Sequence, residues 1–299
     1  MAQVPRPLLD RLTDGPVPVA AVPDADVAAL RDTGATVRRD GDVYRLLDCE
    51  YGGAAVAAAL DPAYAVEWHS TVESTNRIGR RRGAAGHTDR VILAAEQTGG
   101  RGRRDRRWQS PAGGVWLSIV LEPTLQPDRR GLLTFAAAVA VVDAADAVGV
   151  PAQIKWPNDV VVTDADHPGK VAGVLTEVHT ADAGVPYAVL GVGINAAVDP
   201  TSLPVDATSL AAIAGTVDWT TVATTVIETV DALRDDPDRI LRRWRALART
   251  PGHRVRVTTA DGAVVGTAVD VTDTGALVVD DGTDEHVVAA GDCDHLRPA

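Results

Sequence analysis

The sequence predicts an α+β fold in three parts, with a mixed β-sheet flanked by helices at its centre. Between Tyr64 and Arg249, apolar β-branched runs alternate with segments of helical length and spacing. After 250–252 the pattern becomes purely strand-like, with short runs separated by Asp-Gly and Thr-Gly turns. Short helices and a hairpin precede the alternating region. We therefore expect units at 1–62, 63–250 and 251–299.

The first unit resembles the end of a winged-helix module that has lost a helix. Short helices are expected around 8–12 and 24–31, and 36–46 should form a hairpin that turns at Asp-Gly. The segment 15–23 holds three prolines, which leave no room for the helix that precedes a DNA-reading helix. We expect a truncated, winged-helix-like unit without a working recognition helix.

The remaining elements follow from hydrophobic periodicity. In the central unit, strands are expected at 66–70, 91–95, 115–121, 153–156, 160–163, 171–178 and 187–194. Helices are expected at 129–148, 219–234 and 237–249, and a turn at 164–169. The last unit should be a small β-barrel of about fifty residues, with strands at 253–259, 263–272, 276–279 and 286–290.

Composition limits the partners that the chain can have. The net charge is −12, from 41 acidic and 29 basic residues, and only 8 of the acidic residues are Glu. This excess of Asp is typical of proteins from a high-salt cytoplasm; an Arg-rich, high-GC bacterium is the alternative source. A protein with this negative charge binds DNA or an anionic membrane poorly, because binding to these partners requires a basic protein surface. Any anion site should therefore be a local basic island.

The remaining composition signals predict a cytoplasmic protein. Cys49 and Cys293 are far apart and show no Cys-x-x-Cys spacing, which fits a reducing compartment and no structural zinc. The first residues lack the charged and apolar regions of a signal peptide. The longest apolar stretch, 135–150, is interrupted by Asp143 and Asp146. We expect neither a membrane span nor a resident metal.

A basic island occurs at 97–108, directly after a predicted strand. It carries five arginines and ends at Trp108. Guanidinium forks suit phosphate or carboxylate, and the indole offers a face for stacking. The alternatives are a solvated basic loop or an RNA contact. Because the chain as a whole is acidic, a loop that binds an anionic ligand is the favoured interpretation.

Lysine is scarce, so its positions are informative. The chain has 27 arginines but only Lys155 and Lys170. Lys155 ends a predicted strand before Trp156-Pro157, and its ammonium could stabilise charge that develops at phosphorus. An ion pair with Asp159 is the alternative. Lys170 opens a strand, and a structural role at that hairpin is as well supported as a role in the site.

Two polar segments have open interpretations. Ser74, Thr75 and Asn76 could cap a helix, or they could surround a polar, uncharged ring. Asn195 ends a Gly-rich strand and could contact a nucleotide or make a turn.

Together the motifs resemble those of biotin protein ligases over about 66–297. The matching segments are Glu-Ser-Thr-Asn (73–76), Gln-Thr-Gly-Gly-Arg-Gly-Arg-Arg (97–104), Trp-Gln-Ser-Pro (108–111), Trp-Leu-Ser (116–118), Lys-Trp-Pro-Asn-Asp (155–159), Lys-Val-Ala-Gly (170–173), Gly-Val-Gly-Ile-Asn (191–195) and Ala-Thr-Ser-Leu (207–210). The resemblance implies a biotin/lipoate ligase-like catalytic domain followed by an SH3-like barrel.

The resemblance also implies the reaction and its partners. Biotin would react with Mg²⁺-bound ATP to give biotinyl-5'-AMP, and a lysine of a biotin carboxyl carrier protein would then take the biotin. A lipoate or octanoate ligase or transferase is one alternative, and a biotin-responsive DNA-binding repressor is another. The sequence leaves the oligomeric state open, with a homodimer among the alternatives.

The resemblance assigns roles to residues by position. Lys155 and Arg103 would be catalytic. The biotin-binding set would be Ser74, Thr75, Asn76, Gln97, Arg101, Gly102, Arg103 and Lys155. The set that binds ATP or the adenylate would be Arg103, Arg106, Trp108, Lys155 and Asn195.

Overall fold

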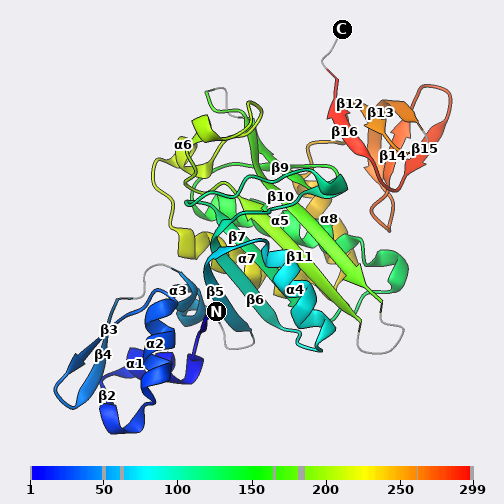
Figure 1. Cartoon of the computed structure of the whole chain (residues 1–299). Helices are drawn as coiled ribbons and strands as arrows, with labels where there is room; N and C mark the ends of the chain where they lie inside the picture. Colours follow the sequence, from blue (N-terminus) through cyan, green and yellow to red (C-terminus); the bar gives the residue numbers. More distant parts are fainter. Residues whose placement is uncertain are drawn as a thin grey trace.

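Three β-sheets organise the chain in a computed structural model (Figure 1). The structure describes residues 2–48, 52–60, 64–163, 166–180, 186–260 and 262–296. The predicted boundary at 62 and part of the predicted turn at 164–169 fall outside these residues. A three-stranded sheet lies in the N-terminal part, an eight-stranded sheet in the centre and a five-stranded sheet in the C-terminal part.

The central sheet is mixed, as the sequence predicts. Its order is β1-β5-β6-β7-β11-β10-β9-β8, and only β5 and β6 pair in parallel. The strands are β1 (Ala2–Gln3), β5 (Ala65–Val72), β6 (Arg90–Gln97), β7 (Val115–Leu121), β8 (Gln153–Lys155), β9 (Asp159–Val162), β10 (Gly169–His179) and β11 (Tyr187–Ile194). Every strand predicted for this unit is present.

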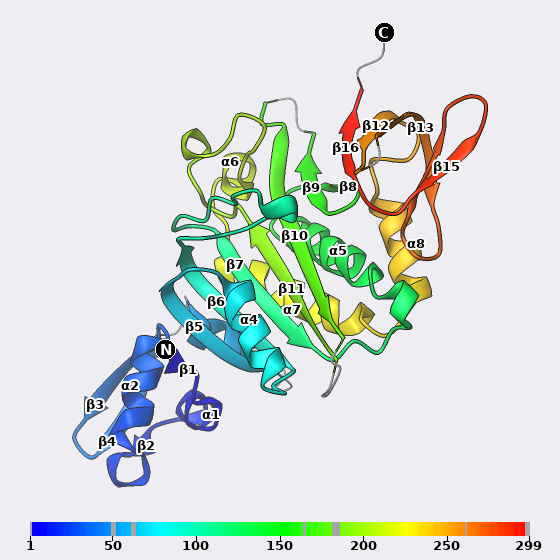
Figure 2. The same cartoon turned by 45° about the vertical axis from the view of Figure 1, so that its right-hand side comes forward.

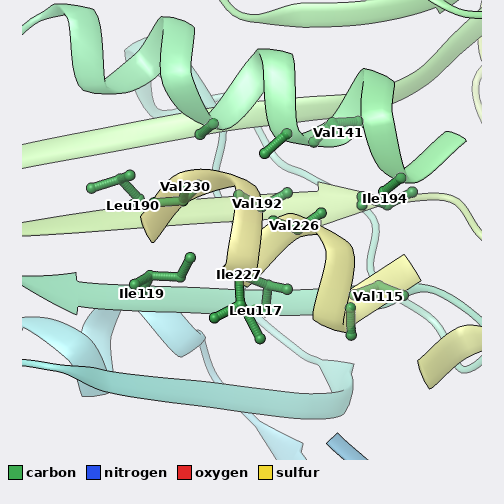
Figure 3. Close-up of a cluster of buried hydrophobic side chains, with 14 of the residues drawn as sticks. Val115, Leu117, Ile119, Val141, Leu190, Val192, Ile194, Val226, Ile227 and Val230 are labelled. Carbon is green, nitrogen blue, oxygen red and sulfur yellow. The ribbon is translucent and has the colours of Figure 1, made fainter. Parts of the chain in front are cut away.

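Helices cover both faces of this sheet (Figure 2). On one face lies α4 (Thr75–Ala84), which packs on β6, β7 and β11. On the other face, α5 (Leu132–Ala147) and α7 (Trp219–Leu233) pack together against the strands, and α8 (Pro237–Leu247) packs on α5. Figure 3 shows the apolar layer between α5, α7 and the sheet, formed by Val115, Leu117, Ile119, Val141, Leu190, Val192, Ile194, Val226, Ile227 and Val230. Burial of these side chains supplies the main driving force for the central fold.

The N-terminal unit is a shortened winged-helix arrangement. It contains α1 (Arg6–Asp14), α2 (Asp24–Asp32) and a sheet of β2 (Val17–Pro18), β3 (Thr36–Asp40) and β4 (Val43–Asp48). Where a complete module would place another helix, the chain makes a single 3-10 turn, Val19–Ala21. Proline at positions 16, 18 and 23 accounts for this, because it removes backbone donors and restricts its neighbours.

This unit is also built into the central domain. Strand β1 pairs with β5 at one edge of the central sheet, and α3 (Gly53–Ala59) packs on β5 and α7. Gly53 permits the contact, since a Cβ there would lie 2.5 Å from the Trp68 side chain. Neither β1 nor α3 is predicted above, because an Ala-rich heptapeptide and a two-residue strand lack periodicity.

The C-terminal strands form an SH3-like antiparallel sheet that does not close. The order is β15-β14-β13-β12-β16. Its members are β12 (Arg254–Thr258), β13 (Ala263–Val271), β14 (Leu277–Asp280), β15 (Glu285–Val288) and β16 (Asp292–His295). The sequence predicts a small SH3-like barrel here, and within the described residues its strands form an open sheet with β15 and β16 at the two edges. Strand β16 is also absent from the prediction, because its four residues, Asp-Cys-Asp-His, carry too short an apolar alternation to be recognised. No helix in the described chain is long and apolar enough to cross a membrane.

Candidate active site

One cavity of about 330 Å³ collects most of the residues that the sequence singles out. It lies between the start of α4, the loop after β6, strands β10 and β11, and the loop before α6 (Leu210–Ala214). Ten of the predicted site residues line it: Ser74, Thr75, Asn76, Gln97, Arg101, Gly102, Arg103, Arg106, Trp108 and Asn195. Lys170 lines it too, whereas Lys155 is not among the described residues that form its wall.

A hydrogen-bonded polar group forms one wall. The Gln97 side-chain oxygen accepts from the Thr75 amide at 2.8 Å, and the Gln97 amide donates to Ser110 Oγ at 2.9 Å. Ser118 Oγ, fully buried on β7, lies 2.8 Å from Thr75 Oγ1. These contacts fix the orientation of both the Gln97 amide and the Thr75 hydroxyl, so this wall is pre-organised and uncharged.

Asn76 is fixed by a second set of contacts. Its oxygen accepts from Ser118 Oγ at 2.7 Å, and its nitrogen donates to the Leu175 carbonyl at 3.2 Å and to Glu177 Oε2 at 2.9 Å. The Ser118 hydroxyl has one proton, so it serves either Asn76 or Thr75 at a given moment. A Cβ on Gly191 would lie 2.0 Å from Asn76 Oδ1. The glycine at this position of β11 therefore makes room for the asparagine.

Lys170 supplies a cation inside the cavity. Its Nζ lies 2.6 Å from Asp159 Oδ1 and 4.9 Å from the centre of the Trp108 ring. The β10 register shifts between Lys170 and Ala172 where it pairs with β9. A bulge of this kind redirects a side chain at a functional site. Here it accompanies an ammonium that faces the cavity from β10, next to β9.

Lys155 lies outside the lining of the cavity as the described residues form it. It ends the edge strand β8. The next amide, that of Trp156, donates to Thr250 Oγ1 at 2.9 Å, and the same hydroxyl lies 3.2 Å from His295 Nε2 on β16. Burial raises the pKa of the Cys293 thiol to about 11, and the Lys155 charge opposes this shift. Burial lowers the pKa of His295 to about 4, and Lys155 lowers it further. The Lys155 charge therefore acts on two residues of β16.

Trp108 and Asn195 carry polar atoms without protein partners. Trp108 lies against two glycines: a Cβ would come within 2.6 Å of its Nε1 from Gly193 and within 3.2 Å of its ring from Gly173. Its Nε1 is buried and has no hydrogen-bond partner within the described part of the chain. The same holds for Asn195 Oδ1, although Asn195 Nδ2 donates to the Thr208 carbonyl at 3.0 Å. A ligand can satisfy both atoms.

The arginine loop, residues 101–107, closes one side of the cavity. Arg103 is half-buried and donates to Asn158 Oδ1 at 3.2 Å. Burial lowers the pKa of its guanidinium, although the nearby carboxylates Asp292 and Asp159 oppose this effect. The loop reaches toward the C-terminal sheet (Figure 2), where Arg104 Nη1 donates to Asp292 at 3.0 Å. Among the described residues, no group of three or more His, Cys, Asp or Glu could hold a metal ion.

Several cavity residues are absent from the predicted set. Asn158 and Asp159 belong to the quoted Lys-Trp-Pro-Asn-Asp segment, so the motif contained them without assigning them a role. Lys170 was the weaker of two candidates. Asp292 had no sequence signal, because it comes from a different sheet and lies 185 or more positions from the loop that it contacts.

Comparison with known proteins agrees with this arrangement. Residues 68–195 match the Biotin/lipoate A/B protein ligase family, and residues 250–296 match the Biotin protein ligase C terminal domain. The biotin–(acetyl-CoA-carboxylase) ligase of Mycobacterium tuberculosis is 38% identical over 238 residues, which cover 75% of this chain and 86% of that protein. The chain belongs to the biotin protein ligase family. It is therefore a ligase, and the C-terminal match favours the biotin branch over the lipoate branch.

Other members of the biotin protein ligase family are similar over shorter spans or in fold alone. The bifunctional ligase/repressor BirA of Bacillus subtilis is 33% identical over 204 residues, which cover 64% of this chain and 61% of that protein. The biotin protein ligase of Aquifex aeolicus in complex with biotin and ATP has a TM-score of 0.63 at 24% identity, covering 78% of this chain and 99% of that one. The latter likeness establishes the shared fold.

Proposed function

We propose that this chain joins biotin to a lysine of a biotin carboxyl carrier protein domain in two steps that share the cavity. In the first step a biotin carboxylate oxygen attacks the α-phosphorus of Mg²⁺-bound ATP. A P–O bond breaks, and biotinyl-5'-AMP and pyrophosphate form. In the second step the carrier lysine amine attacks the biotinyl carbonyl. The C–O bond to AMP breaks, AMP leaves, and the nitrogen loses a proton to give the amide.

The observation that carries this proposal is the grouping of three chemistries in one cavity. A neutral hydrogen-bonding wall lies at Thr75 and Gln97, a cation at Lys170, and a stacking surface at Trp108. The two reactants need these groups side by side: uncharged donors and acceptors for a ureido ring, positive charge for a carboxylate meeting a phosphate, and an aromatic face for adenine.

For the biotin end, we assign the ureido ring to Ser74, Thr75, Asn76 and Gln97. All four line the cavity, and the hydrogen bonds of Thr75, Asn76 and Gln97 hold them in place before any ligand arrives. A pre-ordered polar wall discriminates strongly, because a ligand that lacks matching groups leaves buried atoms without partners.

For the catalytic cation, we assign Lys170 in place of Lys155. Lys170 projects into the cavity, and the Asp159 carboxylate at 2.6 Å holds its ammonium. A fixed ammonium can neutralise charge that develops on the α-phosphate while the carboxylate attacks. The scarcity of lysine in the sequence still supports a specific role for a lysine in the site. The geometry favours Lys170 for that role.

For the nucleotide, we assign Arg101, Gly102 and Arg103 to the loop that covers the adenylate. Arg106 would contact phosphate. Trp108 would stack on adenine, and the unpartnered Asn195 Oδ1 can accept from the adenine amino group. Closure of such a loop keeps water from the mixed anhydride until the carrier lysine arrives.

The N-terminal unit gives little support to the repressor alternative. Helix α2 directly precedes the hairpin, where a recognition helix would lie. Its exposed residues include Asp24 and Asp32 and a single base, Arg31. A helix of this charge repels the phosphate backbone, whereas DNA-binding helices are basic.

The decisive assay follows biotin transfer by the full-length protein. With Mg²⁺ and ATP, we expect pyrophosphate release on adding biotin and stable biotin incorporation into a carrier domain on adding both substrates. Lipoate and octanoate at equal concentration are the matched controls. Transfer of either acid in preference to biotin, or no ATP-dependent transfer at all, contradicts the proposal.

A further inference from the structure

One carboxylate of the C-terminal sheet fastens the arginine loop. Asp292, at the start of β16, accepts from Arg104 Nη1 at 3.0 Å and from Arg106 Nη2. Arg104 also donates to the Thr258 carbonyl on β12 at 3.3 Å. The Asp292 side chain is only 22% exposed, whereas those of Arg104 and Arg106 are 44% and 68% exposed. Two exposed guanidinium groups thus converge on one largely buried carboxylate.

The loop backbone depends on contacts of this kind. Arg104 and Asp105 both have left-handed conformations, with φ of 54° and 56°. Consecutive non-glycine residues with positive φ are unfavourable and persist when surrounding contacts hold them. Arg104 is held at its side chain by β12 and β16. The ion pairs between Asp292 and the two arginines therefore help to impose the loop conformation.

Asp292 also lines the cavity itself. Its carboxylate there occupies guanidinium donors that an anionic ligand could use. The loop brings five arginines and a single acid, Asp105, so it carries a large excess of positive charge. Without a counter-anion, such a loop repels itself and opens.

We propose that Asp292 is a positioning residue that acts as an internal anion for the arginine loop. It pairs with Arg104 and Arg106 in the free protein, and the pyrophosphate portion of the nucleotide displaces it from them on binding. This inference rests on the proposed function, because it names pyrophosphate as the competing anion. It predicts that removing the Asp292 charge loosens the empty loop and at the same time strengthens pyrophosphate binding.

The two effects separate this idea from a purely structural contact. If Asp292 only supports the loop, its removal should loosen the loop and weaken binding of any ligand there. If Asp292 competes for the arginines, its removal should tighten the binding of an anion. The sign of the change in pyrophosphate affinity is therefore the deciding measurement.

The first test is limited trypsin digestion of full-length Asp292→Asn in the absence of ligands. Trypsin cleaves after arginine, so the rate of cleavage within 101–107 measures how readily the loop opens. Because exposed ion pairs each contribute up to about 1 kcal/mol, we expect cleavage in 101–107 to accelerate roughly five-fold. Asp294→Asn removes the same charge from an exposed position on the same strand and is the matched control. Equal cleavage rates in wild type and Asp292→Asn overturn the proposal.

The second test is calorimetric binding of pyrophosphate at about 0.1 M KCl, where charges still interact over about 10 Å. We expect Asp292→Asn to bind pyrophosphate roughly three-fold more tightly than wild type, with Asp294→Asn changed much less. Asp292→Glu, which keeps the carboxylate, should resemble wild type in both tests. Unchanged or weaker pyrophosphate binding by Asp292→Asn overturns the proposal.

Neither readout requires biotin, so the outcome is separable from the proposed function. Failure of the wild-type protein to make biotinyl-AMP would refute the ligase assignment and leave the loop measurements intact. Conversely, an active wild-type ligase with no change in Asp292→Asn refutes only the internal-anion role. Thermal melting of each variant confirms that it is folded before either test.

Discussion

The Lys170 ammonium lies 2.6 Å from the Asp159 carboxylate within the cavity wall. The pair joins two neighbouring strands at the β10 bulge. Asp159 restricts the rotation of a flexible side chain, so the positive charge is held in one place before substrate binds. Fixed charge of this kind is effective in catalysis, because no reorganisation is required during the reaction.

Lys170→Ala should lower the rate of biotinyl-AMP formation about 100-fold or more, as expected for loss of a group aimed at developing charge. Lys170→Arg should recover little, because a planar fork does not replace a compact ammonium in a confined site. Biotin-dependent pyrophosphate release measures both.

Lys155→Ala is the matched control for that experiment. It removes the only other lysine, and Lys155 is not among the described residues that line the cavity. We expect adenylate formation within a few-fold of wild type. If Lys155→Ala is the severely impaired variant and Lys170→Ala is active, the assignment of the catalytic cation is reversed.

Arg103→Gly should still form the adenylate but retain it poorly. The half-buried guanidinium ties the loop to Asn158, and glycine removes this contact while adding backbone freedom. Released biotinyl-AMP should then biotinylate bystander proteins, which a blot of a protein mixture detects. A variant that makes no adenylate and shows no leakage would place Arg103 in the chemical step instead.

A buried ion pair should control stability at low pH. Burial alone would raise the pKa of Glu67, but hydrogen bonds from His69 and Arg82 outweigh it and lower the pKa from 4.5 to about 2. A depressed carboxyl pKa stabilises the fold above pH 4.5, and this contribution is lost as the pH falls from 4.5 toward 2.

Urea unfolding of Glu67→Gln measures this contribution, because glutamine resembles the protonated acid. The stability difference from wild type should be constant near neutral pH and shrink below pH 4.5. Arg82→Ala, which leaves Glu67 with one partner fewer, should lose about 3 kcal/mol at neutral pH. A pH-independent difference for Glu67→Gln would show that the carboxylate charge contributes nothing.

Added salt should stabilise the protein. With 33 Asp, 8 Glu and a net charge of −12, repulsion among surface carboxylates opposes folding at low ionic strength. Molar KCl reduces the Debye length from about 10 Å to about 3 Å and relieves this repulsion. We expect both the melting temperature and ligase activity to rise between dilute buffer and 1 M KCl. A melting temperature that falls over this range contradicts the halophilic interpretation.

Deletion of residues 1–60 should destabilise the protein, because β1 covers the edge of the central sheet and α3 packs on α7. The N-terminal unit therefore packs on the central domain and is not a freely removable module. A milder change isolates any DNA-binding role: Arg38→Ala with Arg39→Ala in the hairpin should leave both biotin transfer and melting temperature unchanged. DNA binding by the wild-type protein that is lost in this double variant would support the repressor alternative.

The sequence by itself determined the layers of the fold and singled out most of the motifs that line the cavity. The strands and helices of the central domain follow from the period of the hydrophobic residues. Short apolar runs predict the buried strands, and longer apolar segments predict the buried helices α5 and α7. The polar trio, the arginine loop and Trp108 were visible as motifs, since each is contiguous in the chain.

Only the tertiary structure places Lys170, and not Lys155, among the described residues that line the cavity, and only it brings Asp292 to the arginine loop. Lys155 and Lys170 both lie at strand ends, and their directions depend on how β8 joins the C-terminal sheet and on a bulge in β10. Sequence spacing does not encode a register shift. The contact of Asp292 with Arg104 joins residues 188 positions apart on different sheets. Such a pair is set by domain packing, which local patterns do not report.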